Sequence, residues 1–266
     1  YDASVEESWL AWASGATLVV MDDETARLGP DLIPWLRRER ITVLCPPPTL
    51  LRTTGCRDPE SELPDLRLLY VGGEPLTHDV ADLWAKGRRL VNGYGPTECT
   101  VTCVRGDIRC GDEIVIGRAV PGMTAWIMDE SLNEVGQGLS GELCFSGIGV
   151  ARGYHNRPDL TADKFVQVPG VGRVYRTGDR ARLRADGTLE YQGRLDSQVK
   201  IRGYRIELEG IEAVLTQLPN IREAACRVQE IGGRDDLVAY LVPVDEGVPI
   251  DLHEVIVERV GDQHAV

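Results

Sequence analysis

The order of predicted elements over the first hundred residues limits the fold more than any other feature of the sequence. Short apolar runs alternate there with stretches whose apolar residues recur at helical spacing. In chain order these segments are residues 17–21, 31–40, 41–44, 66–71 and 77–86. Strands and helices that alternate with short connections are typical of a mostly parallel sheet covered by helices. The sequence therefore predicts an α/β region over residues 1–105.

A further helix is predicted before the first of these segments. Ser4 and Glu7 have the spacing of a capping box, in which the two side chains bind free backbone amides at a helix start. Trp9 and Trp12 then fall on one helical face, and Gly15 favours the end of the helix.

The pattern changes after residue 105. Between residues 113 and 193 short apolar runs are separated by glycines, and Asp186-Gly187 between two such runs is typical of a β-hairpin. We expect residues 106–195 to form a small antiparallel sheet or distorted barrel. Residues 196–266 combine predicted helices at 208–218 and 252–260 with alternating strands, which indicates a small α+β lobe that is incomplete.

Composition excludes several classes of function. The net charge of the 266 residues is −13, which argues against a general nucleic-acid or anionic-membrane surface. No apolar run reaches the length of a membrane span, and we find no signal peptide. The seven cysteines show no zinc-site spacing. Reduced cysteines in a cytoplasmic protein are the simplest interpretation.

The segment from Asn92 to Glu98 carries several groups suited to a nucleotide triphosphate. Tyr94 offers a flat face to a base, and the two glycines beside it let the backbone approach a ligand closely. Thr97 can donate a hydrogen bond to a phosphate, and Glu98 can hold Mg²⁺, which prefers oxygen ligands. The segment follows a predicted strand, where open α/β sheets place their ligand crevices. An ordinary turn is the alternative interpretation.

Three further polar clusters lie on predicted loops or strand ends. Residues 72–75 follow a buried strand, and their backbone could bind the edge of a base. Asp179 comes directly after a glycine and could accept both hydroxyls of a ribose. Arg194 lies among glycines and cations and could pair with ribose or phosphate oxygens. Each cluster taken singly is also compatible with a plain turn.

Taken together, four motifs in this order resemble the adenylation domains of nonribosomal peptide synthetases, within the larger family of adenylate-forming enzymes. They read NGYGPTE from Asn92, GELCFSGIGVARGY from Gly141, YRTGD from Tyr175 and GRLDSQVKIRGYRIE from Gly193. The opening YDAS also resembles a Phe-Asp-x-Ser element of that family, so the resemblance spans nearly the whole chain.

The resemblance implies a two-step reaction. A substrate carboxylate attacks the α-phosphate of ATP and gives an acyl-adenylate and pyrophosphate. The phosphopantetheine thiol of a carrier domain then takes the acyl group as a thioester. The implied requirements are ATP, Mg²⁺, an amino acid and a peptidyl carrier domain, in cis or in trans.

The resemblance also assigns roles to individual residues of the nucleotide site. Tyr94 stacks on adenine, Thr97 contacts the phosphates, Glu98 ligates Mg²⁺, Asp179 binds the ribose hydroxyls and Arg194 reaches ribose or phosphate. Thr97, Glu98 and Arg194 are the implied catalytic residues. The full nucleotide set is Gly73, Glu74, Pro75, Asn92, Gly93, Tyr94, Gly95, Thr97, Asp179, Tyr191 and Arg194.

Two further assignments concern the third region of the chain. Asp196 matches the hinge about which the small lobe rotates between the two half-reactions. Lys200 and Gly203 match the loop that enters the site for thioester formation. The family's phosphate loop would lie before Tyr1 and its second lysine after Val266, so we expect the chain alone to adenylate poorly or not at all.

The resemblance places an amino acid pocket on residues scattered over the first 102 positions. They are Asp2, Ala3, Glu6, Cys45, Tyr70, Gly72, Gly93, Val101 and Thr102. Asp2 corresponds to the aspartate that pairs with an α-amino group, which favours an α-amino acid. A buried Glu6 would need a partner, and a cationic substrate side chain is one interpretation. The other is that Glu6 lies in the first turn of a helix, where the helix dipole favours it.

Two other functions remain open at this point. One is an acyl-CoA synthetase-type ligase that uses free CoA, which Asp2 disfavours because it indicates an amino acid substrate. The other is a non-catalytic nucleotide-binding remnant. The presence of Thr97, Glu98, Asp179 and Arg194 argues against such a loss of function.

Overall fold

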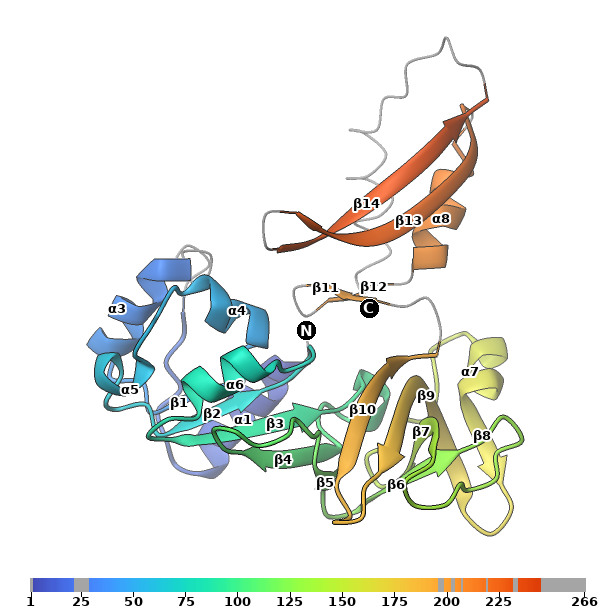
Figure 1. Ribbon diagram of the computed structural model, residues 1–266. Coiled ribbons are helices and arrows are strands. Elements are labelled where there is room, and N and C mark those ends of the chain that lie inside the picture. The colour runs from blue at the N-terminus through green and yellow to red at the C-terminus, as the bar shows by residue number, and fades with distance from the viewer. Residues whose placement is uncertain are drawn as a thin grey trace. The chain divides into compact units, whose positions relative to one another are not determined.

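The computed structural model describes residues 2–21, 29–195, 199–201, 204–206, 208–218, 220–231 and 234–244. The chain divides into two compact units, Tyr1–Leu195 and Asp196–Val266 (Figure 1). Within the described ranges, no helix is long and apolar enough to cross a membrane.

The first half of unit 1 is built on a five-stranded sheet, here called sheet A. Its strands lie in the order β1 (Val43–Leu44), β2 (Leu68–Val71), β3 (Arg89–Tyr94), β4 (Val104–Ile108) and β5 (Arg118–Ala119). The first three strands run parallel, as the sequence predicts, whereas β4 and β5 join antiparallel. The parallel part is confirmed, and the sheet as a whole is mixed.

Short helices cover sheet A. They are α3 (Leu32–Arg38), α4 (Pro48–Thr53), α5 (Pro59–Glu62) and α6 (His78–Trp84), with a 3₁₀ turn at Gly29–Asp31. In α6, Val80 and Trp84 are four residues apart and therefore share one face. Both pack in one buried cluster with Leu69 of β2 and Leu90 of β3, which fixes α6 against the sheet.

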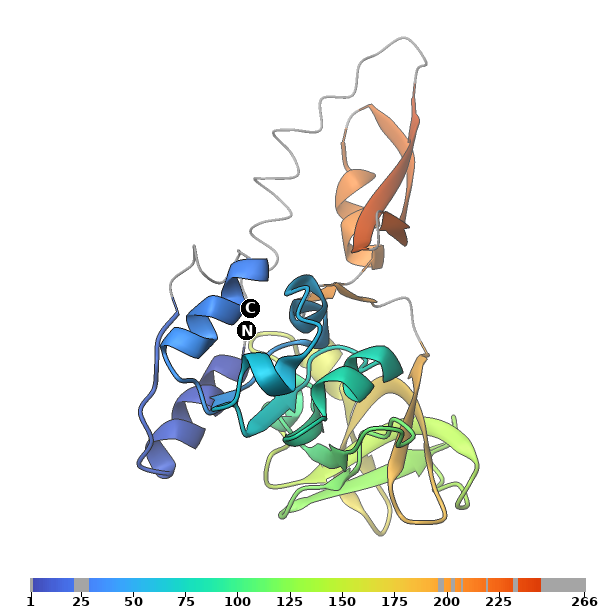
Figure 2. The same cartoon turned by 60° about the vertical axis from the view of Figure 1, so that its left-hand side comes forward.

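The start of the chain corrects two sequence predictions. Helix α1 (Ala3–Ala13) begins two residues earlier than predicted, and its N-cap, Asp2, makes no side-chain capping bond, so the capping box was wrong. The apolar run at residues 17–21 forms no strand. Its Val20 is 81% exposed, because no described strand pairs with this segment to bury it. Figure 2 shows α1 on the outer side of unit 1.

The second half of unit 1 is a curled antiparallel sheet, here called sheet B, as the sequence predicts (Figure 1). Its strands are β6 (Met123–Met128), β7 (Ser140–Gly147), β8 (Phe165–Val168), β9 (Gly172–Leu183) and β10 (Leu189–Arg194), with α7 (Pro158–Lys164) before β8. The order is β10-β9-β7-β6, and β8 also pairs with β9. The predicted hairpin at Gly187 joins β9 to β10, and its φ of +79° suits glycine.

One buried cluster joins the two sheets of unit 1. Tyr94 and Val104, from sheet A, pack in it with Leu143, Phe145 and Tyr175, from sheet B. The last strands of sheet A therefore share a core with sheet B. The carboxyl end of β3 lies at this junction.

Unit 2 has the predicted α+β character. It contains β11 (Val199–Ile201), β12 (Tyr204–Ile206), α8 (Leu208–Leu215), β13 (Ile221–Ile231) and β14 (Arg234–Pro243). Leu208, Ile211 and Leu215 of α8 form a core with Cys226 of β13. The helix predicted at residues 252–260 lies outside the described residues.

Candidate functional site

Several of the residues singled out from the sequence lie at one edge of sheet A. Cys45, Gly72 and Gly95 each follow the last residue of β1, β2 or β3. Because these three strands run parallel, their carboxyl ends meet at the same edge, where open α/β sheets bind ligands. A Cβ atom at Gly72 would come within 2.9 Å of the Gly93 carbonyl oxygen, so these neighbouring strand ends lie very close.

A buried carboxylate lies beside this edge. Asp179 of β9 is only 2% exposed. Its Oδ1 accepts a bond from Nη1 of Arg194 at 3.0 Å, and its Oδ2 accepts one from the hydroxyl of Tyr94. Burial, and after it the charge of Asp179, raises the pKa of Tyr94 well above its usual value, so the phenol stays a donor. The charge of Asp179 is therefore paired and both carboxylate oxygens are engaged.

Tyr94 itself lies among aromatic rings. Its ring centroid is 6.1 Å from that of Phe145 and 6.2 Å from that of Tyr191. Only 7% of Tyr94 is exposed, which the sequence did not indicate. Any contact between Tyr94 and a base would use this small exposed part, while the half-buried Tyr191 offers more surface.

The turn after Tyr94 is tightly packed and strained. A Cβ atom at Gly95 would lie 2.1 Å from the carbonyl oxygen of Val101, so only glycine fits there. Thr100 and Val101 both have positive φ, +62° and +65°, which is rare for β-branched residues. Backbone strain of this kind persists only where the surrounding structure holds it in place, and it clusters at ligand sites.

Glu98 lies in this turn, in a 3₁₀ segment (Thr97–Cys99). The hydroxyl of Tyr154 donates to its Oε1 at 2.5 Å, and the amide of Ala151 donates to its carbonyl oxygen at 2.8 Å. The neighbouring Thr97 is exposed. The sequence did not single out Tyr154, although it ends one of the quoted motifs.

A second polar cluster contains residues predicted for the amino acid pocket. The Thr102 hydroxyl donates to Oε2 of Glu6 at 3.0 Å, and Tyr70 lies within interaction range of both. Burial raises the pKa of Glu6 above its usual value, while the bonds from Thr102 and Tyr70 act in the opposite direction. Oδ2 of Asp2 is buried and accepts no hydrogen bond from any residue in the described ranges.

The same cluster perturbs its neighbours. Burial, followed by the charges of Glu7 and Glu6, raises the pKa of the Cys45 thiol to about 12. Burial likewise raises the pKa of Tyr70 to about 12. A Cβ atom at Gly93 would come within 2.9 Å of the Tyr70 hydroxyl, so the glycine makes room for this ring.

Some predicted site residues already hold structural partners. The Asn92 amide donates to the carbonyl of Val115 at 2.9 Å, and Thr49 donates its hydroxyl to Glu74 at 2.6 Å. Gly73 has a φ of +82°, the half-buried Ala3 begins α1, and Pro75 is exposed.

Three predicted residues belong to unit 2. Asp196 and Gly203 lie outside the described residues, and Lys200 is in β11, paired with Arg205. Their roles remain predictions.

Comparison with known proteins decides the family. The family described as AMP-binding enzyme matches residues 1–155, more than half of the chain. The chain belongs to the AMP-binding enzyme family. This AMP-binding enzyme is 40% identical over 259 residues to tyrocidine synthase 2 of Brevibacillus parabrevis, covering 95% of the chain and 7% of that protein.

Solved structures agree with this AMP-binding assignment. PA1221, a nonribosomal peptide synthetase protein containing adenylation and PCP domains, matches with a TM-score of 0.82 and 34% identity. The match covers 94% of this chain and 52% of PA1221. The Vibrio cholerae adenylation domain AlmE, in complex with glycyl-adenosine-5′-phosphate, matches with a TM-score of 0.79 and 32% identity, over 91% of this chain and 48% of AlmE. The α/β fold expected from the sequence is thus the fold of adenylation domains.

Proposed function

We propose that the protein activates an α-amino acid as an aminoacyl-adenylate and passes it to the phosphopantetheine thiol of a peptidyl carrier domain. In the first step a carboxylate oxygen of the amino acid bonds to the α-phosphorus of ATP, and pyrophosphate leaves. In the second step the thiol sulfur bonds to the acyl carbon, the thiol proton is lost and AMP leaves. The chain spans 52% or less of the relatives described above, so the proposal concerns the whole protein.

The buried pair of Asp179 and Arg194 carries the proposal. A carboxylate that accepts bonds from Arg194 and Tyr94 is held in one orientation, which suits it to two vicinal ribose hydroxyls. Arg194 stands beside it and would also reach ribose or phosphate oxygens. Adenylyl transfer depends mainly on such positioning and on charge neutralisation.

The carboxylate of Glu98 is suited to bind the magnesium ion that the resemblance implies. Mg²⁺ is usually bound by one or two carboxylates together with waters and substrate phosphates. Tyr154 holds Oε1 of Glu98 in place, and the exposed Thr97 hydroxyl would donate to a phosphate. When bound, Mg²⁺ would neutralise charge on the phosphates.

The Asp2 and Glu6 side chains support an amino acid substrate that carries two positive charges. An α-ammonium group would supply the partner that Oδ2 of Asp2 lacks among the described residues. A second ammonium, as in lysine, ornithine or diaminobutyrate, would offset the cost of ionising the half-buried Glu6. We therefore propose a diamino acid. AlmE, described with a glycyl adenylate, has the same fold but need not share this preference.

The carrier step is supported by the structural relatives. PA1221 combines adenylation and PCP domains in one chain, which supports a carrier partner for this protein. The division into two compact units falls between Leu195 and Asp196, and we propose Asp196 as the hinge for the second step. Lys200 and Gly203 would then belong to the segment that serves thioester formation.

Amino-acid-dependent exchange between ATP and pyrophosphate, measured on the whole protein across proteinogenic and diamino acids, tests the proposal. We expect exchange with at least one amino acid, strongest with a diamino acid. Absence of exchange with every acid would refute the adenylation function. Exchange confined to apolar amino acids would refute the diamino preference alone. Product formation with free CoA but not with a carrier domain would favour an acyl-CoA synthetase-type ligase.

A further inference from the structure

Strand β9 contains a bulge at the position of Asp179. Opposite it on β7, Glu142 pairs with Arg180 and Cys144 pairs with Arg176. One residue of β7, Leu143, therefore faces the three residues 177–179 of β9. A bulge bends the strand and re-aims its side chains, and such bulges are frequent next to active sites. Here it turns the Asp179 carboxylate toward Tyr94 and Arg194.

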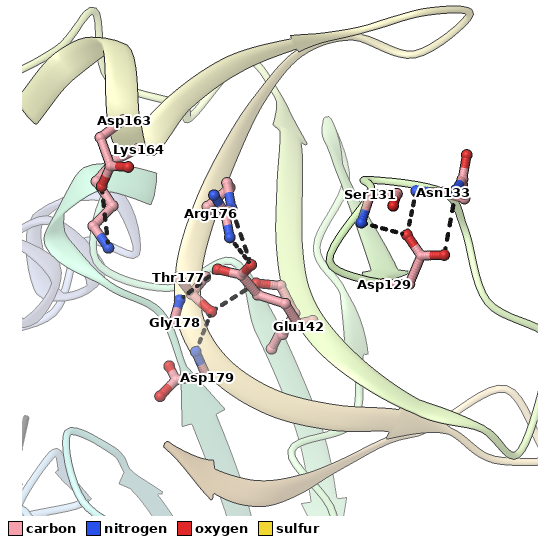
Figure 3. Close-up of polar contacts among 11 residues, drawn as sticks. Asp129, Ser131, Asn133, Glu142, Asp163, Lys164, Arg176, Thr177, Gly178 and Asp179 are labelled. Atoms are coloured by element: carbon pink, nitrogen blue, oxygen red, sulfur yellow. Dashed lines mark hydrogen bonds and ion pairs between the residues drawn. The ribbon is translucent and has the colours of Figure 1, made fainter. Parts of the chain in front are cut away.

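A bulge of this size removes ladder hydrogen bonds, and Glu142 replaces one of them. The amide of Gly178 donates to Oε1 of Glu142 at 3.0 Å (Figure 3). Gly178 has a φ of +72°, a conformation that glycine adopts without strain. Glu142 is only 8% exposed, so its carboxylate needs both a hydrogen bond and a counter-charge.

Arg176 supplies that counter-charge. Its Nε and Nη2 both donate to the other carboxylate oxygen, Oε2 of Glu142, at 3.0 and 2.8 Å (Figure 3). The two carboxylate oxygens of Glu142 thus have different partners: Oε2 binds the Arg176 guanidinium and Oε1 binds the backbone of the bulge.

Thr177 completes the support of the bulge. Its hydroxyl donates to the carbonyl of Leu143 at 2.6 Å and accepts the amide of Asp179 at 2.9 Å. The amides of Gly178 and Asp179 are therefore held by side chains instead of strand partners. Figure 3 shows Glu142 lying between Arg176 on one side and Gly178 on the other.

We propose that Glu142 is a positioning residue for nucleotide recognition. It acts through Gly178 to fix the backbone of the bulge, and the bulge fixes the Asp179 carboxylate that would bind the ribose hydroxyls. This inference rests on the proposed function, because it assumes that the nucleotide ribose binds at Asp179. A glutamine at position 142 would turn its NH₂ group, a donor, toward either the Arg176 guanidinium or the backbone N–H of Gly178. Both of these are donors too, so one of the present hydrogen bonds would be lost and the bulge would loosen.

The sheet also contains a matched control. Arg182 donates its Nε and Nη2 to one oxygen of Glu190, at 3.1 and 2.8 Å, which reproduces the geometry of Arg176 and Glu142. This pair joins β9 to β10, and within the described part of the chain it makes no hydrogen bond to residues 177–179. Glu190→Gln therefore removes an ion pair of the same donor geometry, although a more exposed one, from the same sheet without touching the bulge.

The experiment compares wild type, Glu142→Gln and Glu190→Gln, using ATP and 2′,3′-dideoxy-ATP in exchange assays of the whole protein. For Glu142→Gln we expect KM for ATP to rise roughly tenfold, the effect of about 1.4 kcal/mol for a misplaced charge-assisted bond. We expect the preference for ATP over the dideoxy nucleotide to fall by a similar factor, with an unchanged KM for the amino acid. Glu190→Gln should leave all three values unchanged.

An unchanged preference between the two nucleotides in Glu142→Gln would overturn the proposal, even with a lower melting temperature, because Glu142 would then only stabilise the fold. If Glu142→Gln does not fold, Arg176→Lys decides instead. That variant keeps the charge and the Gly178 bond but loses the paired donors, so we expect a smaller loss of the same preference. No loss there would also refute the proposal.

Titration calorimetry with the two nucleotides gives a readout that needs no turnover. If no amino acid supports exchange, the proposed adenylation function is refuted. The positioning role of Glu142 would still be supported if wild type binds ATP more tightly than the dideoxy nucleotide and Glu142→Gln reduces that preference. Equal binding of both nucleotides by wild type would refute that role.

Discussion

The two polar clusters of unit 1 differ in how fully their charges are satisfied by the protein. On the nucleotide side, Asp179 is 2% exposed and both of its oxygens accept hydrogen bonds. On the amino acid side, Asp2 has a buried oxygen that no described residue binds, and Glu6 is half-buried with a raised pKa. In the first cluster both carboxylate oxygens have described partners. In the second cluster the structure describes no ion pair, and the charge of Arg105 lowers the pKa of Glu6 less than burial raises it.

The two sides should therefore affect the stability of the fold differently. A buried, fully bonded carboxylate contributes to folding and holds its geometry before a ligand arrives. A carboxylate without a partner destabilises the fold, and a cationic ligand can offset that cost on binding. Substitutions on the nucleotide side should reduce both stability and activity, and substitutions on the amino acid side should reduce activity without lowering stability.

The largest expected effect separates the two sides directly. Asp179→Asn removes the negative charge from the buried ion pair with Arg194, and breaking a buried ion pair typically costs about 3 kcal/mol of stability. The asparagine would also replace two charge-assisted hydrogen bonds to the ribose hydroxyls by neutral ones. The combined loss of binding free energy should lower kcat/KM for ATP roughly 100-fold. Asp2→Asn should raise KM for the amino acid strongly without lowering the free energy of unfolding, because the buried Oδ2 has no described partner to lose. Urea unfolding and exchange kinetics measure both quantities.

Equal destabilisation by Asp179→Asn and Asp2→Asn would remove the distinction between the two sides. The matching control is Asp129→Asn. Within the described residues, the Asp129 carboxylate accepts hydrogen bonds from its own turn, from the amides of Ser131 and Asn133 and the Asn133 side chain, so this variant should leave ATP kinetics unchanged.

The next effect concerns the metal ligand on the nucleotide side. Glu98→Gln should lower exchange roughly tenfold to 100-fold and raise the Mg²⁺ concentration needed for half-maximal rate, because an amide is a weaker ligand for Mg²⁺. Tyr154→Phe removes one bond to Glu98 and should lower exchange only about fivefold, as one hydrogen bond is worth about 1 kcal/mol. A Mg²⁺ titration of the exchange rate measures both. An unchanged titration curve in Glu98→Gln would remove Glu98 from the metal site.

The contacts that complete the nucleotide side could not be predicted from sequence. Local signals sufficed for the hairpin at Gly187 and for the parallel strands that bring Cys45, Gly72 and Gly95 to one edge. The bond between Tyr154 and Glu98, by contrast, joins residues 56 positions apart, and that between Gly178 and Glu142 joins residues 36 positions apart. Only the folded register brings such groups together.

The same limit explains the errors at the start of the chain. Helical spacing placed Trp9 and Trp12 on one face of α1, and the structure leaves them 62% and 56% exposed. Spacing shows which side chains share a face, but it does not show whether another element covers that face. The apolar run at residues 17–21 fails for the same reason, since a strand requires a neighbour.

A smaller effect tests the shape of the amino acid side. In Gly93→Ala the new Cβ would meet the Tyr70 hydroxyl at 2.9 Å and must displace the ring from Glu6 and Thr102. We expect KM for the amino acid to rise roughly tenfold, because overpacking costs about 1–3 kcal/mol. Gly136→Ala is the control, since its Cβ would meet only Leu139, at 3.9 Å. A larger rise in KM for ATP than for the amino acid would place Gly93 on the nucleotide side.

The smallest expected effect addresses the charge of Glu6. Glu6→Gln should lower the preference for ornithine over its uncharged isostere norleucine by about fivefold, the value of a partly exposed ion pair of about 1 kcal/mol. Because burial raises the pKa of Glu6, its carboxyl stays protonated to a higher pH than usual. KM for ornithine should therefore fall as pH rises through that pKa and stay level above it, whereas Glu6→Gln should show no such fall.

Rising pH should improve the binding of ornithine but lower the stability of the unliganded fold. A carboxyl whose pKa is higher in the folded than in the unfolded state binds more protons when folded, so its contribution is greatest below the unfolded pKa. That contribution is lost as pH rises through the folded pKa of Glu6, and saturating ornithine should restore it. A pH series of urea midpoints, with and without ornithine, measures this for wild type and Glu6→Gln. Identical pH dependence of the urea midpoints in the two proteins would mean that the charge of Glu6 is already satisfied by the protein, as that of Asp179 is. Glu6 would then only stabilise the start of α1.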